Sequence, residues 1–120
     1  MVVYDLAHRL ARNIKESTEY QDFLVVRKEL LDDGKASEML QDFRKEEMNL
    51  QAKVFSGQEI SEEEKTKLNN LREIINLNQK VKKYIEAEYR MGIVINDLQE
   101  IIFSDLELGL PQEEKKHPEE

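Results

Sequence analysis

One long helical signal constrains this chain more than any other feature. Residues 80 to 104 contain no proline, and their apolar side chains recur at intervals of three and four residues. This spacing places them on one face of an α-helix, which has 3.6 residues per turn. At 1.5 Å per residue, such a helix is about 37 Å long. Its apolar positions are Val81, Tyr84, Ile85, Met91, Val94, Ile95, Leu98, Ile101 and Ile102.

A helix of that length does not fit a small sphere. A compact domain of this size has a radius of gyration of about 13 to 14 Å. The 120 residues include only four glycines and two prolines, with 39% hydrophobic and 37% charged residues, which is typical of long amphipathic helices. The sequence therefore predicts an all-α fold, an elongated bundle of about five helices that dimerises. We expect one helical domain over residues 1–110 and a disordered acidic tail over residues 111–120.

Four shorter helices are expected before the long one. Their apolar stripes predict helices over residues 3–16, from Thr18 to the turn at residues 32–34, over 36–55 and over 62–77. Glu47 interrupts the stripe of the third. We expect Gly34 to close the second helix in the left-handed conformation.

Capping signals mark several of these boundaries. Ser17 and Thr18 offer a cap for the second helix, and Gly57 suits the end of the third. Ser61 and Glu64 have the spacing of a capping box, in which each side chain bonds the backbone N–H of the other residue. Asn78 is expected to separate the last two helices. The alternative is one kinked helix over residues 62–104.

Charge and composition exclude several classes of function. The formal net charge is −8, so the protein repels a polyphosphate backbone at long range, and direct nucleic-acid binding is disfavoured. The absence of cysteine excludes disulfides, thiolate nucleophiles and cysteine-ligated clusters. No run approaches 18 consecutive apolar residues, and the start at Met1 lacks the features of a secretion signal. We therefore expect a cytoplasmic protein with no membrane span and no cofactor.

Candidates for metal or catalytic sites are weak. Asp5 with His8, and Glu114 with His117, have the carboxylate-x-x-His spacing found in di-metal helical bundles. The second pair falls in the expected tail, and the further inward glutamates that such a centre needs are missing. No strand-turn-helix elbow presents a serine to a histidine. We predict that the protein is not an enzyme and has no metal site.

The middle of the long helix carries the predicted oligomer interface. Glu88 lies beside the apolar face, so its carboxylate needs a partner from another helix or another subunit. Gly92 costs about 1 kcal/mol relative to alanine unless another helix approaches it closely. We therefore predict that the long helix crosses another helix, or its own copy, at Glu88, Met91, Gly92, Ile95 and Leu98.

Three lysines at the start of the long helix form a second candidate surface. Lys80, Lys82 and Lys83 lie where the helix dipole favours negative charge. A solvated helix face is the simpler interpretation of this patch. The alternative is a site for an acidic partner or for RNA phosphates, with Arg72 nearby.

Several motifs together resemble a known family. They are the opening Tyr4-Asp5-Leu6-Ala7, the pair Glu19-Tyr20, the segment from Met39 to Arg44, the hinge at Gly57 and Ile60 to Glu64, and the run from Glu86 to Ile102. In order and spacing they resemble the YlbF/YmcA/YheA family of small bacterial helical proteins, nearest to the YheA-like branch. The resemblance covers the chain up to Leu110.

The resemblance implies an all-helical, oligomeric protein with no known catalytic residues. Some members of the family act as regulatory partners in competence, sporulation and biofilm formation, through a complex that modulates RNA processing. Members of that complex have been associated with iron–sulfur clusters bound through cysteines, which this chain lacks. Our hypothesis is a homodimeric, non-enzymatic adaptor that binds a protein partner. The alternative is an accessory protein that binds RNA directly.

Overall fold

The computed structural model describes residues 1–109, which form five α-helices and contain no strand. The helices are α1 (Val2–Glu16), α2 (Thr18–Asp32), α3 (Gly34–Phe55), α4 (Glu62–Asn76) and α5 (Gln79–Phe103). The predicted all-α fold with a long C-terminal helix is confirmed, since α5 has 25 residues. The tail predicted over residues 111–120 lies outside the described part of the chain.

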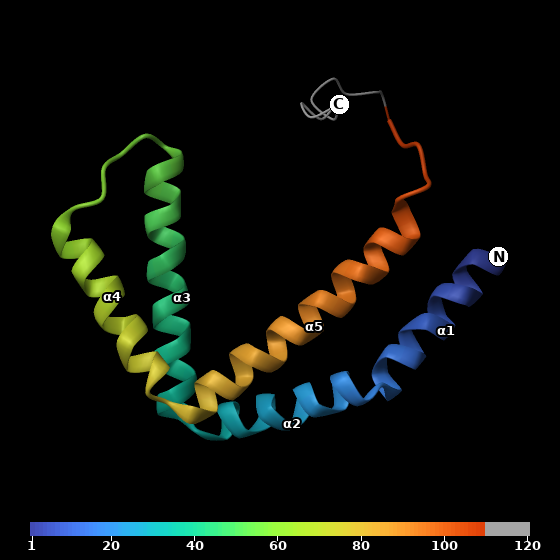
Figure 1. The fold of residues 1–120 in the computed structure, drawn as a ribbon, viewed down its shortest axis with the longest axis horizontal. Coiled ribbons are helices and arrows are strands. Elements are labelled where there is room, and N and C mark those ends of the chain that lie inside the picture. Colours follow the sequence, from blue (N-terminus) through green and yellow to red (C-terminus); the bar gives the residue numbers. More distant parts are fainter. Residues whose placement is uncertain (110–120) are drawn as a thin grey trace, which may run out of the picture.

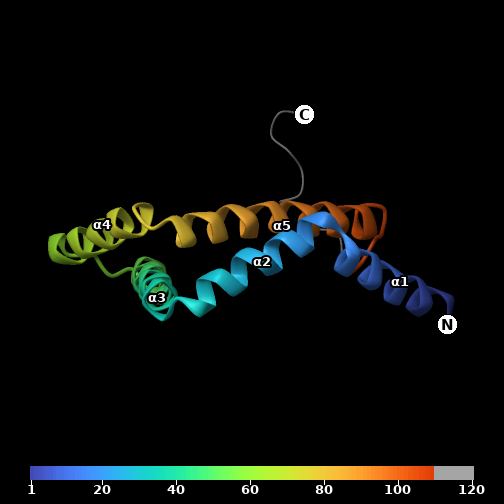
Figure 2. The same ribbon diagram turned by 90° about the horizontal axis from the view of Figure 1, so that it is seen from below.

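The helices are arranged in two arms that meet at one end (Figure 1). The hairpin arm consists of the antiparallel helices α3 and α4. The long arm consists of α2 and α5, also antiparallel, with α1 at its outer end (Figure 2). The radius of gyration is 19.5 Å and the extents are 51 × 40 × 26 Å, so the predicted elongated shape is confirmed.

The hydrophobic core lies at the junction where the two arms meet. All four helices from α2 to α5 contribute to it, through Leu30, Ala36, Leu40, Ile75 and Val81. Phe43, Tyr84 and Ile85 pack around this cluster. The ring centroids of Phe23 and Tyr84 lie 5.6 Å apart, which extends the packing between α2 and α5. The junction therefore fixes the angle between the arms.

Local hydrogen bonds set most helix boundaries as predicted. The Asn78 side chain accepts a hydrogen bond of 3.0 Å from the backbone N–H of Val81, so α4 and α5 are separate helices. Ser61 and Glu64 form the expected capping box. Ser17 caps α2, and Gly57 has a φ of 84° just after α3.

The prediction for Gly34 is wrong. Gly34 is the first residue of α3, and within residues 1–109 only Gly57 and Gly109 have positive φ. The Asp33 side chain accepts a hydrogen bond of 3.2 Å from the N–H of Ala36 and so begins α3 at once. Because Asp33 serves as the cap, the turn between α2 and α3 needs no left-handed residue.

Candidate interaction surfaces

A groove opens between the two helices of the hairpin arm. It has a volume of about 530 Å³, and its apolar lining comes from α3, α4 and the loop between them. We call it the hairpin groove; its apolar residues are Leu50, Val54, Phe55, Ile60 and Leu68. Residues of α3 and α4 line it at intervals of three and four, so the two helices face each other across it.

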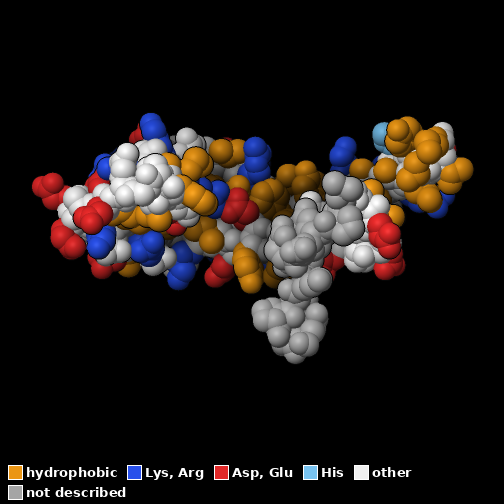
Figure 3. All heavy atoms as spheres, turned by 90° about the horizontal axis from the view of Figure 1, so that it is seen from above, with side chains coloured by type: hydrophobic (Ala, Val, Ile, Leu, Met, Phe, Trp, Pro, Cys, Tyr) orange, Lys and Arg blue, Asp and Glu red, His pale blue; other side chains and the backbone are white. Residues whose placement is uncertain are grey.

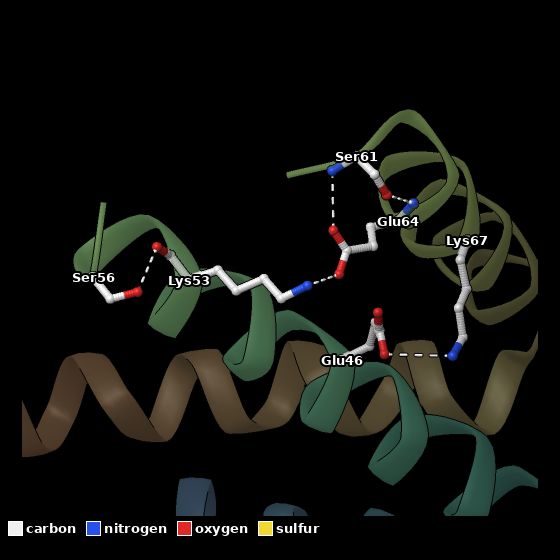
Figure 4. A network of polar contacts seen from close by, with 6 residues as sticks. All are labelled: Glu46, Lys53, Ser56, Ser61, Glu64 and Lys67. Atoms are coloured by element: carbon white, nitrogen blue, oxygen red, sulfur yellow. Dashed lines mark hydrogen bonds and ion pairs between the residues drawn. The ribbon is translucent and has the colours of Figure 1, made fainter. Parts of the chain in front are cut away.

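Ion pairs across the loop hold the two walls of the groove together (Figure 4). The Lys53 ammonium on α3 pairs with the Glu64 carboxylate on α4. Lys67 on α4 lies 3.5 Å from Glu46 on α3. The hydrogen bond from Lys53, followed by that from the Ser61 N–H, lowers the pKa of Glu64 below its ordinary value of 4.5. The capping box and these pairs fix where α4 begins relative to α3.

The edge of the groove formed by α4 carries two basic side chains, of which Lys65 lies 3.5 Å from Glu62. Lys65 and Arg72 lie two helical turns apart on α4 and both line the groove. The Arg72 guanidinium lies 5.6 Å from the centre of the Phe43 ring, so it is anchored in a cation–π contact. Glu47 and Gln51 line the α3 edge. The groove therefore presents an apolar floor with positive charge along one side.

A second apolar surface lies at the outer end of the long arm. Helix α1 has no buried residue, although its apolar side chains form one stripe. Figure 3 shows hydrophobic side chains gathered on α1 at one end of the molecule. We call this the distal surface; its exposed apolar residues are Val2, Val3, Tyr4 and Leu6 on α1, with Ile101, Ile102 and Phe103 on α5.

The lengths of the helices explain why the end of α5 is exposed. Lys80 lies 3.3 Å from Asp33, which aligns the start of α5 with the end of α2. Helix α2 has 15 residues and α5 has 25. At 1.5 Å per residue, α5 therefore extends about 15 Å beyond α2. Helix α1 contacts α2 but does not contact α5, so within residues 1–109 the end of α5 stays uncovered.

Glu88, the first residue of the predicted interface, has an interhelical partner in its own chain. Arg44 on α3 donates two hydrogen bonds to its carboxylate, one of them 3.1 Å from Nη1 to Oε2. The bond to Glu88 raises the pKa of Arg44, and burial raises the pKa of the neighbouring Tyr84. The pair links the hairpin arm to the long arm.

The other residues of the predicted interface differ in exposure. Met91 and Leu98 are half-buried, whereas Gly92 and Ile95 are exposed. Apart from the adjacent backbone of α5 itself, no atom of the described chain lies within 4 Å of the position that a Cβ at Gly92 would occupy. No other helix of residues 1–109 therefore crosses α5 at this glycine. A crossing by a second copy stays a prediction.

The three lysines of the predicted anion patch have different surroundings. Lys80 is engaged by Asp33, while Lys82 and Lys83 are exposed. Lys83 and Arg90 line a hollow together with the acidic residues Asp22 and Glu86. These carboxylates reduce the positive potential of the patch. Arg72, expected nearby, lines the hairpin groove instead.

The weak metal candidate at His8 gains no further ligands. His8 and Asp5 lie on α1, both exposed. Within residues 1–109, no group of three or more His, Cys, Asp or Glu side chains is placed to hold a metal ion. Glu114 and His117 lie outside the described residues. None of the helices described is both long enough and apolar enough to cross a membrane.

Sequence reasoning missed the hairpin groove and the role of Arg44. Glu47, which interrupts the apolar stripe of α3, was the available signal, because it lies half-buried at the edge of the groove. Nothing in the sequence near Arg44 or Glu88 indicated that the two residues meet.

Comparison with known proteins identifies the family. The family model described as "Control of competence regulator ComK, YlbF/YmcA" matches residues 3–107. The chain belongs to the YlbF/YmcA family. The predicted family membership is therefore confirmed.

Relatives of similar length support the assignment. A UPF0342 protein of Halothermothrix orenii is 46% identical over 115 residues, which are 96% of this chain and 98% of the relative. A UPF0342 protein of Symbiobacterium thermophilum is 37% identical over 109 residues, covering 91% and 97% of the two chains.

A solved structure shares the fold of this YlbF/YmcA family member. It is described as a protein of unknown function (DUF964) from Bacillus stearothermophilus. The TM-score is 0.72 at 22% identity, over 87% of this chain and 91% of that one. At this identity the likeness concerns the fold alone.

Proposed function

We propose that this protein is a cytoplasmic, non-enzymatic regulatory protein that works as a homodimer and binds a partner protein. In this proposal residues 1–110 act as one helical domain. The observation that carries it is the apolar surface that one chain leaves open at both ends, in the hairpin groove and on the distal surface. Contiguous apolar surface of this kind marks sites of protein interaction.

The family description supports the regulatory part of the proposal. It refers to control of the competence regulator ComK. We therefore place the protein in the class of regulators that act on other regulators by contact. The proposal of direct RNA binding has less support, since Lys80 is paired with Asp33 and Lys83 has acidic neighbours.

We assign partner binding to the hairpin groove. The occupant that fits is an amphipathic helix of the partner, because two facing helices leave room for a third. Its apolar stripe would contact Val54 and Leu68 on the floor. Acidic side chains on its flank would lie beside Lys65 and Arg72, to which they are complementary in charge.

Affinity purification with paired variants tests this assignment. Val54→Glu places a carboxylate on the apolar floor, where the side chain is 60% exposed and the fold tolerates it. We expect the proteins captured by the unmodified chain from its native organism, identified by mass spectrometry, to be lost with this variant.

The matched control is Met48→Glu, which introduces the same charge on the same helix. Met48 is 67% exposed and does not line the groove. We expect Met48→Glu to retain the captured proteins. Equal capture by both variants would reject the groove as the binding site, and capture of nothing by the unmodified chain would contradict the adaptor function.

A further inference from the structure

Within residues 1–109, two apolar helix faces at the outer end of the long arm lack a partner. One is the stripe of α1, where Leu6 is 54% exposed. The other is the end of α5 beyond α2, where Ile101 is 74% and Ile102 47% exposed. Burying such side chains is favourable by about 25 cal/mol for each Å² removed from water. Both faces are therefore available for association.

The two helix segments that carry these faces are also opposite in charge. Helix α1 carries three basic residues, Arg9, Arg12 and Lys15, against two acidic ones. Residues 91–109 carry no lysine or arginine. Their four acidic residues are Asp97, Glu100, Asp105 and Glu107. Within residues 1–109 none of these charged side chains forms an ion pair with another residue. The basic helix and the acidic helix end are complementary.

The turn at Ser17 keeps α1 away from the end of α5 in the same chain. Ser17 has an extended backbone, with a φ of −69° and a ψ of 151°. Its hydroxyl donates a hydrogen bond of 2.7 Å to the carbonyl oxygen of Ile14, and its oxygen accepts one from the N–H of Tyr20. Both helix ends are thereby tied to one residue. These bonds hold the angle at which α1 leaves α2, and at that angle α1 does not contact α5.

We propose that two copies of the chain exchange these faces, with α1 of each copy lying on the C-terminal end of α5 of the other. This inference rests on the homodimer of the proposed function and says where the copies meet. At about 22 Å, the 15 residues of α1 are long enough to cover the roughly 15 Å by which α5 extends beyond α2.

A second copy of the chain covers both apolar faces through a single two-fold axis. Each chain supplies one basic apolar helix and one acidic apolar helix end. A two-fold axis pairs the first with the second twice, which closes the assembly and leaves neither face free. A different protein would have to supply a match for each face separately.

Site-directed cross-linking tests the exchange directly, because the chain has no cysteine of its own. Two single variants, Leu6→Cys and Ile102→Cys, are purified separately, mixed and treated with a short bis-maleimide. A covalent dimer containing one copy of each variant is expected. In such a mixture the α1–α5 link can join only different molecules. The matched control is Leu6→Cys mixed with Val54→Cys, which is expected to stay unlinked.

The outcomes separate this inference from the proposal on which it rests. If sedimentation shows the unmodified protein as a monomer throughout, the homodimer itself fails. If the protein is a dimer but the Leu6→Cys and Ile102→Cys variants do not link, the exchange is wrong. Efficient self-linking of an Ile95→Cys variant in that case would place the contact at the crossing near Gly92.

A charge exchange gives an independent test. Reversing Arg9 and Arg12 to glutamate is expected to weaken the dimer by about tenfold or more, because α1 and the end of α5 then both carry net negative charge. Reversing Asp97 and Glu100 to lysine is expected to do the same. Mixing the two reversed proteins should restore dimers, detected by sedimentation. Failure of the mixture to associate would overturn the assigned pairing.

Discussion

The junction of the two arms and the outer end of the long arm are built from amphipathic helices of the same kind, yet they differ in what they bury. At the junction, four helices enclose Leu30, Leu40 and Val81 almost completely. At the outer end, α1 has an apolar stripe and no buried residue. The difference lies in how many helices meet at each place.

This difference shows that an amphipathic stripe marks a helix face to be covered. It does not say whether the covering helix comes from the same chain or from another. The stripes of α2 to α5 find each other within one chain because short turns bring the helices together at the junction. Among the helices of residues 1–109, the stripe of α1 contacts α2 alone. Within residues 1–109, the outer end is therefore the part of the fold that stays uncovered.

The largest expected effect is that of a cavity at the junction. Leu40 is 4% exposed, so Leu40→Ala is expected to lower the free energy of unfolding by about 2–5 kcal/mol. The matched change at the outer end, Leu6→Ala, removes the same atoms from a side chain that is 54% exposed. In the dissociated chain its cost is expected to stay below about 0.5 kcal/mol.

Urea unfolding at several protein concentrations measures both effects. A dimer that buries Leu6 would make the effect of Leu6→Ala grow as the protein concentration rises. Equal losses for the two variants at the lowest concentration would contradict the contrast between the junction and the outer end.

At Gly92 we expect a substitution to raise the free energy of unfolding, by less than Leu40→Ala lowers it. Apart from the adjacent backbone of α5, nothing lies within 4 Å of the position of a Cβ there, so Gly92→Ala should raise the free energy of unfolding by about 0.5–1 kcal/mol. Gly92→Leu then distinguishes two locations for the dimer contact. We expect an unchanged sedimentation profile, because the exchanged helices meet farther along α5. A monomeric Gly92→Leu variant would instead place the contact at the predicted crossing.

The smallest expected effect concerns acid and the hairpin arm. Because the folded state lowers the pKa of Glu64 from 4.5, its contribution to stability is complete above that pH. The contribution is lost as the pH falls through the lower pKa of the folded state. The difference in melting temperature between the unmodified protein and Glu64→Gln should therefore shrink as the solution is acidified.

The control for this prediction is Glu63→Gln, on the same turn of α4. Glu63 forms no ion pair with the rest of residues 1–109. At neutral pH the melting temperature should fall further with Glu64→Gln than with Glu63→Gln, because of the two only Glu64 pairs with Lys53. If the difference in melting temperature between Glu64→Gln and the unmodified protein stayed constant down to the lowest pH, the ion pair with Lys53 would contribute nothing to stability.

Several features of the molecule follow from the sequence by itself. The caps at Ser17, Ser61 and Asn78 each bond a backbone group within three residues, so the local sequence is sufficient to place them. The stripe of α5 likewise depends only on its own spacing. The family also follows from the sequence, because its motifs stand in order along the chain.

Other features were decided by the tertiary structure. Arg44 and Glu88 are 44 residues apart, and they meet only because the junction brings α3 beside α5. The hairpin groove exists because α3 and α4 meet at an angle that leaves their facing stripes apart. The exposure of the distal surface depends on the direction in which α1 leaves α2. Pairings between distant residues depend on how whole helices pack, which the spacing within any one helix does not encode.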